Sequence, residues 1–215
     1  MPGYPPPVRL TPLAIVLPLA CVIGLSVAAA APATKKAPLH ATFVGDSVSA
    51  SITYSPAAQS QLARGLAVRL DLKVCRRLVQ ESCPYQGSTP STALQAVQSY
   101  HHSLGNVLIV KVGYNEGASG YGQGIDRVVR AALADGATGV VWVTLRETTA
   151  GYHQTNVAIR KATRRWPQLV VADWNAFSAG KPWFGADGLH LTVRGATALA
   201  TFLRPYVFRA ASLGA

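Results

Sequence analysis

Three short segments of this 215-residue chain carry side chains that together could perform nucleophilic chemistry at a carbonyl carbon. Ser47 lies near the start of the globular part, and Asp187 and His190 lie three residues apart near the end. A carboxylate that accepts the Nδ1–H of an imidazole leaves Nε2 free to take a serine proton. Asn115, in the middle of the chain, carries an amide that can donate a hydrogen bond into the same crevice. These four residues are the candidate site.

Each segment also has an ordinary structural interpretation. Gly45-Asp46-Ser47 has the composition of a turn with a helix N-cap, and an asparagine in a glycine-containing loop, such as Asn115, is common in turns. A single histidine is more often structural or simply exposed. The site hypothesis therefore depends on the elements that position the three segments.

Short apolar runs alternate with stretches of helical periodicity, a pattern that requires parallel strands joined by helical crossovers. The expected strands are 41–44, 66–74, 106–112, 139–145 and 168–173, and the expected helices are 47–64, 91–104, 121–134, 154–166 and 193–209. We therefore predict an α/β domain with a five-stranded parallel sheet and helices on both faces. Such sheets bind their ligands at the carboxyl ends of the strands, which is where all three segments fall.

In this order, the segments Gly45-Asp46-Ser47, Gly113-Tyr114-Asn115 and Asp187-Gly188-Leu189-His190 resemble the sequence blocks of the SGNH (GDSL-like) hydrolases. The resemblance covers residues 41–206. It implies a flavodoxin-like three-layer α/β/α fold and no metal or organic cofactor.

The resemblance also implies a role for each candidate residue. Ser47 corresponds to the nucleophile, His190 to the general base and later general acid, and Asp187 to the residue that orients His190. The side-chain amide of Asn115 and the backbone N–H of Ser47 correspond to donors of an oxyanion hole.

Two positions depart from the family pattern. Glu116 stands where an Asp usually follows the Asn. The family's second block has a glycine whose N–H is a third oxyanion donor, whereas this chain has Cys75 and Arg76 at the matching place. A backbone N–H does not require glycine, so either residue can donate, and we assign this role to the Arg76 backbone N–H.

The chain carries 20 Lys and Arg against nine Asp and Glu, a formal net charge of +11. The basic residues occur singly or in pairs, without the spacing of a nucleic-acid-binding motif, so we expect no nucleic-acid partner. A basic surface would instead attract anionic polymers or membrane surfaces. The 49% hydrophobic and 13% charged composition is that of a globular domain, which we place at residues 41–210.

Residues 10–31 form an uncharged apolar run that begins after Arg9 and ends in small residues. This pattern predicts that residues 1–31 are a cleaved signal peptide or an uncleaved membrane anchor, followed by a linker at 32–40. The domain would then be secreted or held at the extracytoplasmic cell surface. Cys21 lies within this apolar run, so the domain itself has two cysteines, Cys75 and Cys83. In an exported chain, this pair is expected to form a disulfide.

The stretch DLKVCR and the ending DGLHLT resemble SGNH domains that act on acylated cell-envelope glycans. The blocks enclose no long apolar lid to shelter a fatty chain, which favours a short acyl group such as acetyl. We therefore expect an exported serine esterase acting on acyl esters, for example on a polysaccharide or peptidoglycan. Two alternatives remain open, an acyltransferase with the same triad and an inactive envelope-binding protein, and the sequence does not indicate the oligomeric state.

Overall fold

The computed structural model describes residues 1–6 and 38–214 of the chain. The chain divides into a unit over Met1–Lys36 and a compact unit over Ala37–Ala215, and the elements below belong to the second unit. The expected export segment, residues 10–31, lies outside the described residues, as does most of the expected linker at 32–40. Within the described residues, no helix is long and apolar enough to cross a membrane.

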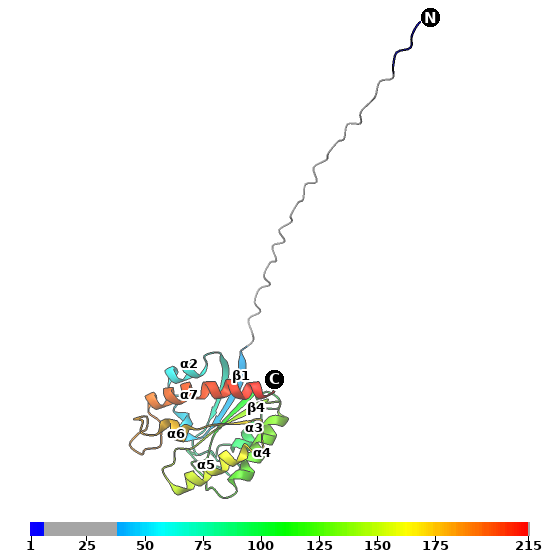
Figure 1. Ribbon diagram of the computed structural model, residues 1–215. Helices are drawn as coiled ribbons and strands as arrows, with labels where there is room; N and C mark the ends of the chain where they lie inside the picture. The colour runs from blue at the N-terminus through cyan, green and yellow to red at the C-terminus, as the bar shows by residue number, and fades with distance from the viewer. Residues whose placement is uncertain (7–37, 215) are drawn as a thin grey trace. The chain divides into compact units, whose positions relative to one another are not determined.

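Five strands form one parallel sheet in the order β2-β1-β3-β4-β5 (Figure 1). Their bounds are β1 Leu39–Gly45, β2 Leu66–Leu72, β3 Val107–Lys111, β4 Gly139–Val143 and β5 Leu169–Ala172. The central strands are apolar because helices cover both faces of the sheet. The predicted α/β fold with a five-stranded parallel sheet is confirmed, although β1 begins two residues earlier than predicted, inside the expected linker.

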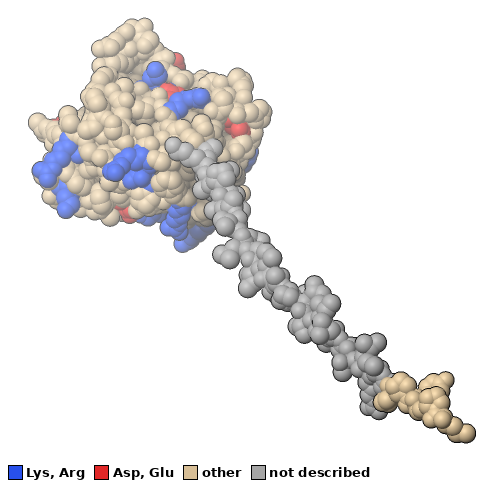
Figure 2. Space-filling view, turned by 90° about the horizontal axis from the view of Figure 1, so that it is seen from above, with Lys and Arg blue, Asp and Glu red and all other residues tan. Residues whose placement is uncertain are grey.

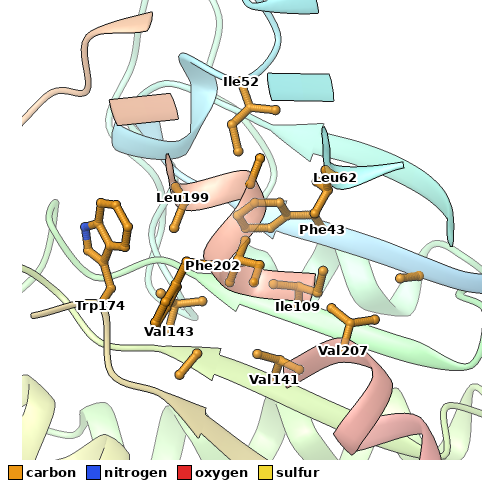
Figure 3. Packing of buried hydrophobic residues seen from close by; sticks show 14 of the residues in the cluster. Phe43, Ile52, Leu62, Ile109, Val141, Val143, Trp174, Leu199, Phe202 and Val207 are labelled. Atoms are coloured by element: carbon orange, nitrogen blue, oxygen red, sulfur yellow. The ribbon is translucent and has the colours of Figure 1, made fainter. Parts of the chain in front are cut away.

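Helices form the two outer layers (Figure 1). Their bounds are α1 Ser47–Ala50, α2 Pro56–Leu62, α3 Ala93–Gln98, α4 Tyr121–Ala134, α5 Ala150–Ala162, α6 Trp174–Ser178, α7 Val193–Ala211 and the short 3₁₀ helix Ser212–Gly214. Side chains of α2 and α7 pack on one face, where Phe43, Ile109 and Val141 of the strands meet α7 (Figure 3). Side chains of α3, α4 and α5 pack on the other face.

Helix α5 begins and ends four residues earlier than the predicted helix 154–166. Three further differences from the predicted helices have a local reason. The predicted helix 47–64 is divided into α1 and α2, because Pro56 lacks an N–H and disfavours helical geometry at Ser55. Helix α3 ends before residue 104, since His101 and His102 have positive φ angles of 45° and 68°. Helix α6 was not predicted, because its five residues are too few to show a period.

Candidate active site

Ser47 is the first residue of α1, directly after the carboxyl end of β1. The fully buried Asp46 caps this helix, because its Oδ1 atom accepts the Val48 N–H at 3.2 Å. Gly45 allows the turn to pack closely, since a Cβ at this position would lie 2.7 Å from Leu72 Cδ2. The Ser47 hydroxyl is therefore held at the carboxyl edge of the sheet.

Asp187 and His190 lie in the turn before α7, and this turn is held by hydrogen bonds within it. Asp187 Oδ1 accepts the backbone N–H groups of Leu189 at 2.9 Å and His190 at 3.0 Å. These bonds, chiefly that from Leu189, together with the imidazole contact, lower the pKa of Asp187 to about 2. The carboxylate is therefore ionised at neutral pH.

The structure brings the three predicted side chains together in one hydrogen-bonded series. His190 Nδ1 lies 2.6 Å from Asp187 Oδ2, and His190 Nε2 lies 3.1 Å from Ser47 Oγ. The partners come from segments 143 residues apart. This arrangement places a serine hydroxyl, an imidazole and an ionised carboxylate in the geometry needed to activate a nucleophile.

Asn115 lies in the turn that follows β3. Gly113 begins this turn with a φ of 146°, and a Cβ there would lie 3.0 Å from Leu145 Cδ1. Asp46 Oδ2 accepts the N–H groups of Gly113 at 3.2 Å and Tyr114 at 3.3 Å. Asp46 therefore joins the turn that carries Ser47 to the turn that carries Asn115.

A lysine is buried beside this carboxylate. Lys111, the last residue of β3, is fully buried, and its Nζ donates to Tyr114 Oη at 3.2 Å. Burial lowers the pKa of Lys111 to about 8 and raises the pKa of Asp46, while the charge of each opposes the shift of the other. This pair was not predicted from the sequence, although a lysine in the apolar run VLIVKV was a usable signal.

The segment after β2 differs from the prediction for Arg76. Its side chain is fully buried and donates to Asp71 O at 2.6 Å, Asp71 Oδ1 at 2.9 Å and Ser91 O at 3.0 Å. Its backbone N–H donates to Lys73 O at 3.4 Å, and its carbonyl accepts the Asn115 side-chain amide at 3.1 Å. The Arg76 N–H is therefore directed into its own turn, contrary to the expectation that it completes an oxyanion hole.

Cys75 is the alternative donor in this segment. Its φ of 64° lies in the left-handed region that favours glycine, and among the described residues its N–H has no hydrogen-bond acceptor. The expected disulfide to Cys83 is present, with a Cα–Cα distance of 5.2 Å. Cys75 thus combines a crosslinked side chain with a backbone conformation that most side chains avoid.

Three hydrogen bonds connect this segment to the turn after β3. Besides the bond from the Asn115 side chain to Arg76 O, Arg77 Nε donates to Asn115 O at 2.7 Å. Glu116 Oε1 accepts the Leu78 N–H at 2.7 Å, and burial raises the pKa of Glu116 to about 7. Glu116, the departure from the family pattern, therefore joins two loops at the candidate site.

Three further features of the structure lie outside this hydrogen-bonded series. Trp183 lines a hollow of about 730 Å³ between α6 and α7, together with Phe177, Phe202 and Tyr206. The side chain of His153 is exposed and contacts Glu147. Among the described residues, no group of three or more His, Cys, Asp or Glu is arranged to hold a metal ion.

The parallel sheet and its two helical layers form the three-layer α/β fold that was expected, with Ser47 directly after β1. No known family model matches this chain. No curated protein sequence matches it either.

Solved structures with this fold include two carbohydrate esterases and TesA. A carbohydrate acetylesterase family member from Sinorhizobium meliloti is 16% identical, with a TM-score of 0.60 over 81% of this chain and 100% of its own. TesA is 14% identical, with a TM-score of 0.60 over 80% of this chain and 99% of its own. A family 3 carbohydrate esterase from Clostridium thermocellum is 14% identical, with a TM-score of 0.53 over 81% of this chain and 98% of its own. At these identities the likeness establishes the fold.

Proposed function

We propose that this chain is an exported serine esterase that removes short acyl groups, such as acetyl, from cell-envelope carbohydrate. The observation that carries the proposal is the hydrogen-bonded series from Ser47 through His190 to Asp187 at the carboxyl edge of the sheet. Structural neighbours that are carbohydrate esterases support the substrate class. The predicted export segment at residues 10–31 and the Cys75–Cys83 disulfide support a location outside the cytoplasm.

In this mechanism, Ser47 Oγ attacks the ester carbonyl carbon while His190 Nε2 takes its proton. The tetrahedral intermediate collapses, the bond to the alcohol oxygen breaks, and His190 returns the proton to that oxygen. A water molecule then attacks the acyl group on Ser47 by the same path, which releases the carboxylic acid. Asp187 holds the imidazole in the required tautomer throughout.

The oxyanion of each intermediate would be bound by three donors. The Ser47 N–H lies in the first turn of a helix, where N–H groups have no acceptor within the helix. An asparagine amide has two N–H donors, and Asn115 gives one to Arg76 O, which leaves the other for the oxyanion. We assign the third donor to the N–H of Cys75.

The test is labelling with a fluorophosphonate, a probe that reacts with an activated serine, followed by mass spectrometry with peptide mapping. A structural neighbour, the esterase EstA from Pseudoalteromonas, is inhibited by monoethylphosphonate, a related group. We expect one adduct on Ser47. The Ser47→Ala variant should stay folded and lose labelling, with kcat for acetyl esters reduced by roughly 10³-fold or more.

Ser51→Ala is the matched control, because this serine lies one turn further and donates only to Val48 O. It should label and hydrolyse like the wild-type protein. A folded Ser47→Ala variant that retains activity would refute the site assignment. Absence of any adduct on the folded wild-type protein would instead favour a non-catalytic envelope-binding protein.

A transferase with the same residues differs only in the acceptor that attacks the acyl group on Ser47. Hydrolysis and transfer can be distinguished by repeating the esterase assay with increasing concentrations of a sugar acceptor. Hydrolysis alone releases free acid at every acceptor concentration, whereas transfer yields an acylated sugar at the expense of the acid.

A further inference from the structure

Two arginines are fixed on either side of the candidate site. Arg146 follows β4, and its Nη1 donates to the carbonyl of Gly188, the residue directly after Asp187. The guanidinium carbon lies 3.8 Å from the centroid of the Phe184 ring, and the Arg146 backbone N–H donates to Tyr114 Oη at 2.7 Å. Backbone and side chain are thus both held, and the cation lies within reach of the His190 turn.

Arg77 lies on the other side of the candidate site, next to the turn that carries Asn115. Its Nε donates to the carbonyl of Asn115 at 2.7 Å, and its Nη1 donates to the carbonyl of Glu81 at 3.3 Å. Both arginines are half-buried. Each therefore contacts the backbone of a segment that carries a site residue, one on the side of the proposed base and one on the side of the proposed oxyanion donor.

Among the described residues, neither guanidinium forms an ion pair. Arg77 and Arg146 have no carboxylate oxygen within 4.0 Å there, whereas Arg76, Arg160 and Arg165 each have at least one. The acids nearby have other partners. Asp187 is held by His190 and two backbone N–H groups, and Glu116 is held by Leu78.

Arg146 has more unused hydrogen-bond donors than Arg77. A guanidinium has five N–H donors in a planar fork that matches two oxygens of a carboxylate or phosphate. Only Nη1 of Arg146 has an acceptor among the described residues, which leaves Nε and Nη2 unused. Holding Gly188 in place needs one hydrogen bond and no positive charge, so that role does not account for the guanidinium.

We infer that this site selects esters that carry an anionic group, a carboxylate or a phosphate, and that Arg146 binds this group, with Arg77 adding positive charge from the other side. The inference rests on the proposed esterase function and narrows its substrate class to acylated anionic carbohydrates. The net charge of +11 would also draw such polymers toward the protein.

The test uses three pyranoses acetylated at the same ring hydroxyl that differ only at the sixth carbon. Methyl glucoside is neutral, methyl glucuronide carries a carboxylate, and methyl glucoside phosphorylated at its primary hydroxyl carries a phosphate. Acetate release gives kcat/KM for each at low and high ionic strength. We expect kcat/KM to be higher for the anionic esters than for the neutral ester at low ionic strength. Whichever anionic ester has the higher kcat/KM shows whether the site prefers a carboxylate or a phosphate.

Arg146→Gln should reduce the ratio of anionic to neutral kcat/KM by roughly 10-fold, the value of a charge-assisted hydrogen bond. Arg146→Lys keeps the charge and should retain part of the preference. Arg127→Gln, an exposed arginine on α4, is the control and should leave the ratio unchanged. The ratio is the readout because loss of the Gly188 contact can slow hydrolysis of all three esters equally.

An active enzyme without an anionic preference, or with the same preference after Arg146→Gln, would overturn the inference and leave the esterase proposal intact. Calorimetry of the three sugars with the Ser47→Ala variant repeats the comparison without turnover. If the wild-type protein hydrolyses no ester and Ser47 takes no label, the esterase proposal fails. The binding data then still decide whether Arg146 selects the anionic sugars.

Discussion

A single buried carboxylate aligns two parts of the candidate site. Asp46 accepts N–H groups from Val48 in α1 and from Gly113 and Tyr114 in the turn after β3. Burial raises the pKa of Asp46, and the positive charge of the buried Lys111 opposes this rise. Asp46 therefore adds side-chain hydrogen bonds to the β1–β3 pairing that joins the turns carrying Ser47 and Asn115.

Glu116 leads to a prediction about pH. Its pKa is raised to about 7 from 4.5, so between these values the folded protein keeps a proton that the unfolded chain has lost. The free energy of unfolding should therefore fall as the pH rises through this window. Glu116→Gln keeps the acceptor for the Leu78 N–H and removes the titration, so near pH 8 it should be more stable than wild type by on the order of 1–3 kcal/mol.

Urea unfolding between pH 4 and pH 8 measures this difference. Glu81→Gln is the matched control, because this glutamate is exposed and should leave the pH profile unchanged. The two stability curves should converge near pH 4, where Glu116 is protonated in both states. Parallel curves for wild type and Glu116→Gln would show that burial does not raise this pKa.

At the scale of elements, the segment between β2 and α3 is where sequence reasoning was weakest. Strands were predicted well because strands buried on both faces are continuous apolar runs. The helix at 47–64 was predicted too long, although Pro56 is an explicit break signal. The left-handed backbone of Cys75 had no signal, since nothing in the residue type indicates a positive φ.

The left-handed backbone of Cys75 leads to a prediction about the effect of the disulfide on stability and on kcat. Replacing both cysteines by serine should lower stability by about 2–3 kcal/mol, the value of closing a loop of this size. It should also lower kcat, because a serine at position 75, no longer crosslinked, would leave the left-handed region and withdraw its N–H from the oxyanion. Cys75→Gly combined with Cys83→Ser loses the same crosslink but accepts the φ of 64°.

Comparison of the two double variants separates stability from catalysis. Both should unfold at similar urea concentrations, apart from the entropic cost of the added glycine, while the variant with Cys75→Gly should retain the higher kcat. Steady-state kinetics on an acetyl ester, together with urea unfolding, provides both quantities. Equal kcat values in the two double variants would contradict the assignment of the Cys75 N–H to the oxyanion hole.

For the whole molecule, the candidate site could be predicted because of a topological rule. In a parallel sheet the carboxyl ends of the strands lie at one edge, so Ser47, Asn115 and His190 were expected to converge despite their separation in sequence. Arg77 and Arg146 were not predicted, because they contact backbone carbonyls and belong to no sequence block. On the face seen in Figure 2, Lys and Arg cover more of the surface than Asp and Glu do.

The last prediction concerns export, because a disulfide next to the site links activity to the compartment. We expect the full chain, produced in a bacterium, to reach the extracytoplasmic fraction with Cys75 and Cys83 oxidised. A variant with Ile15→Arg and Leu17→Arg interrupts the apolar run at 10–31 and should stay in the cytoplasm with both thiols free. Fractionation, thiol alkylation and mass spectrometry measure both properties.

The N-terminal peptide decides whether the segment is cleaved near Ala31 or retained as an anchor. A wild-type chain that stays in the cytoplasm with free thiols would refute export, and it would also remove the crosslink on which the proposed oxyanion geometry depends.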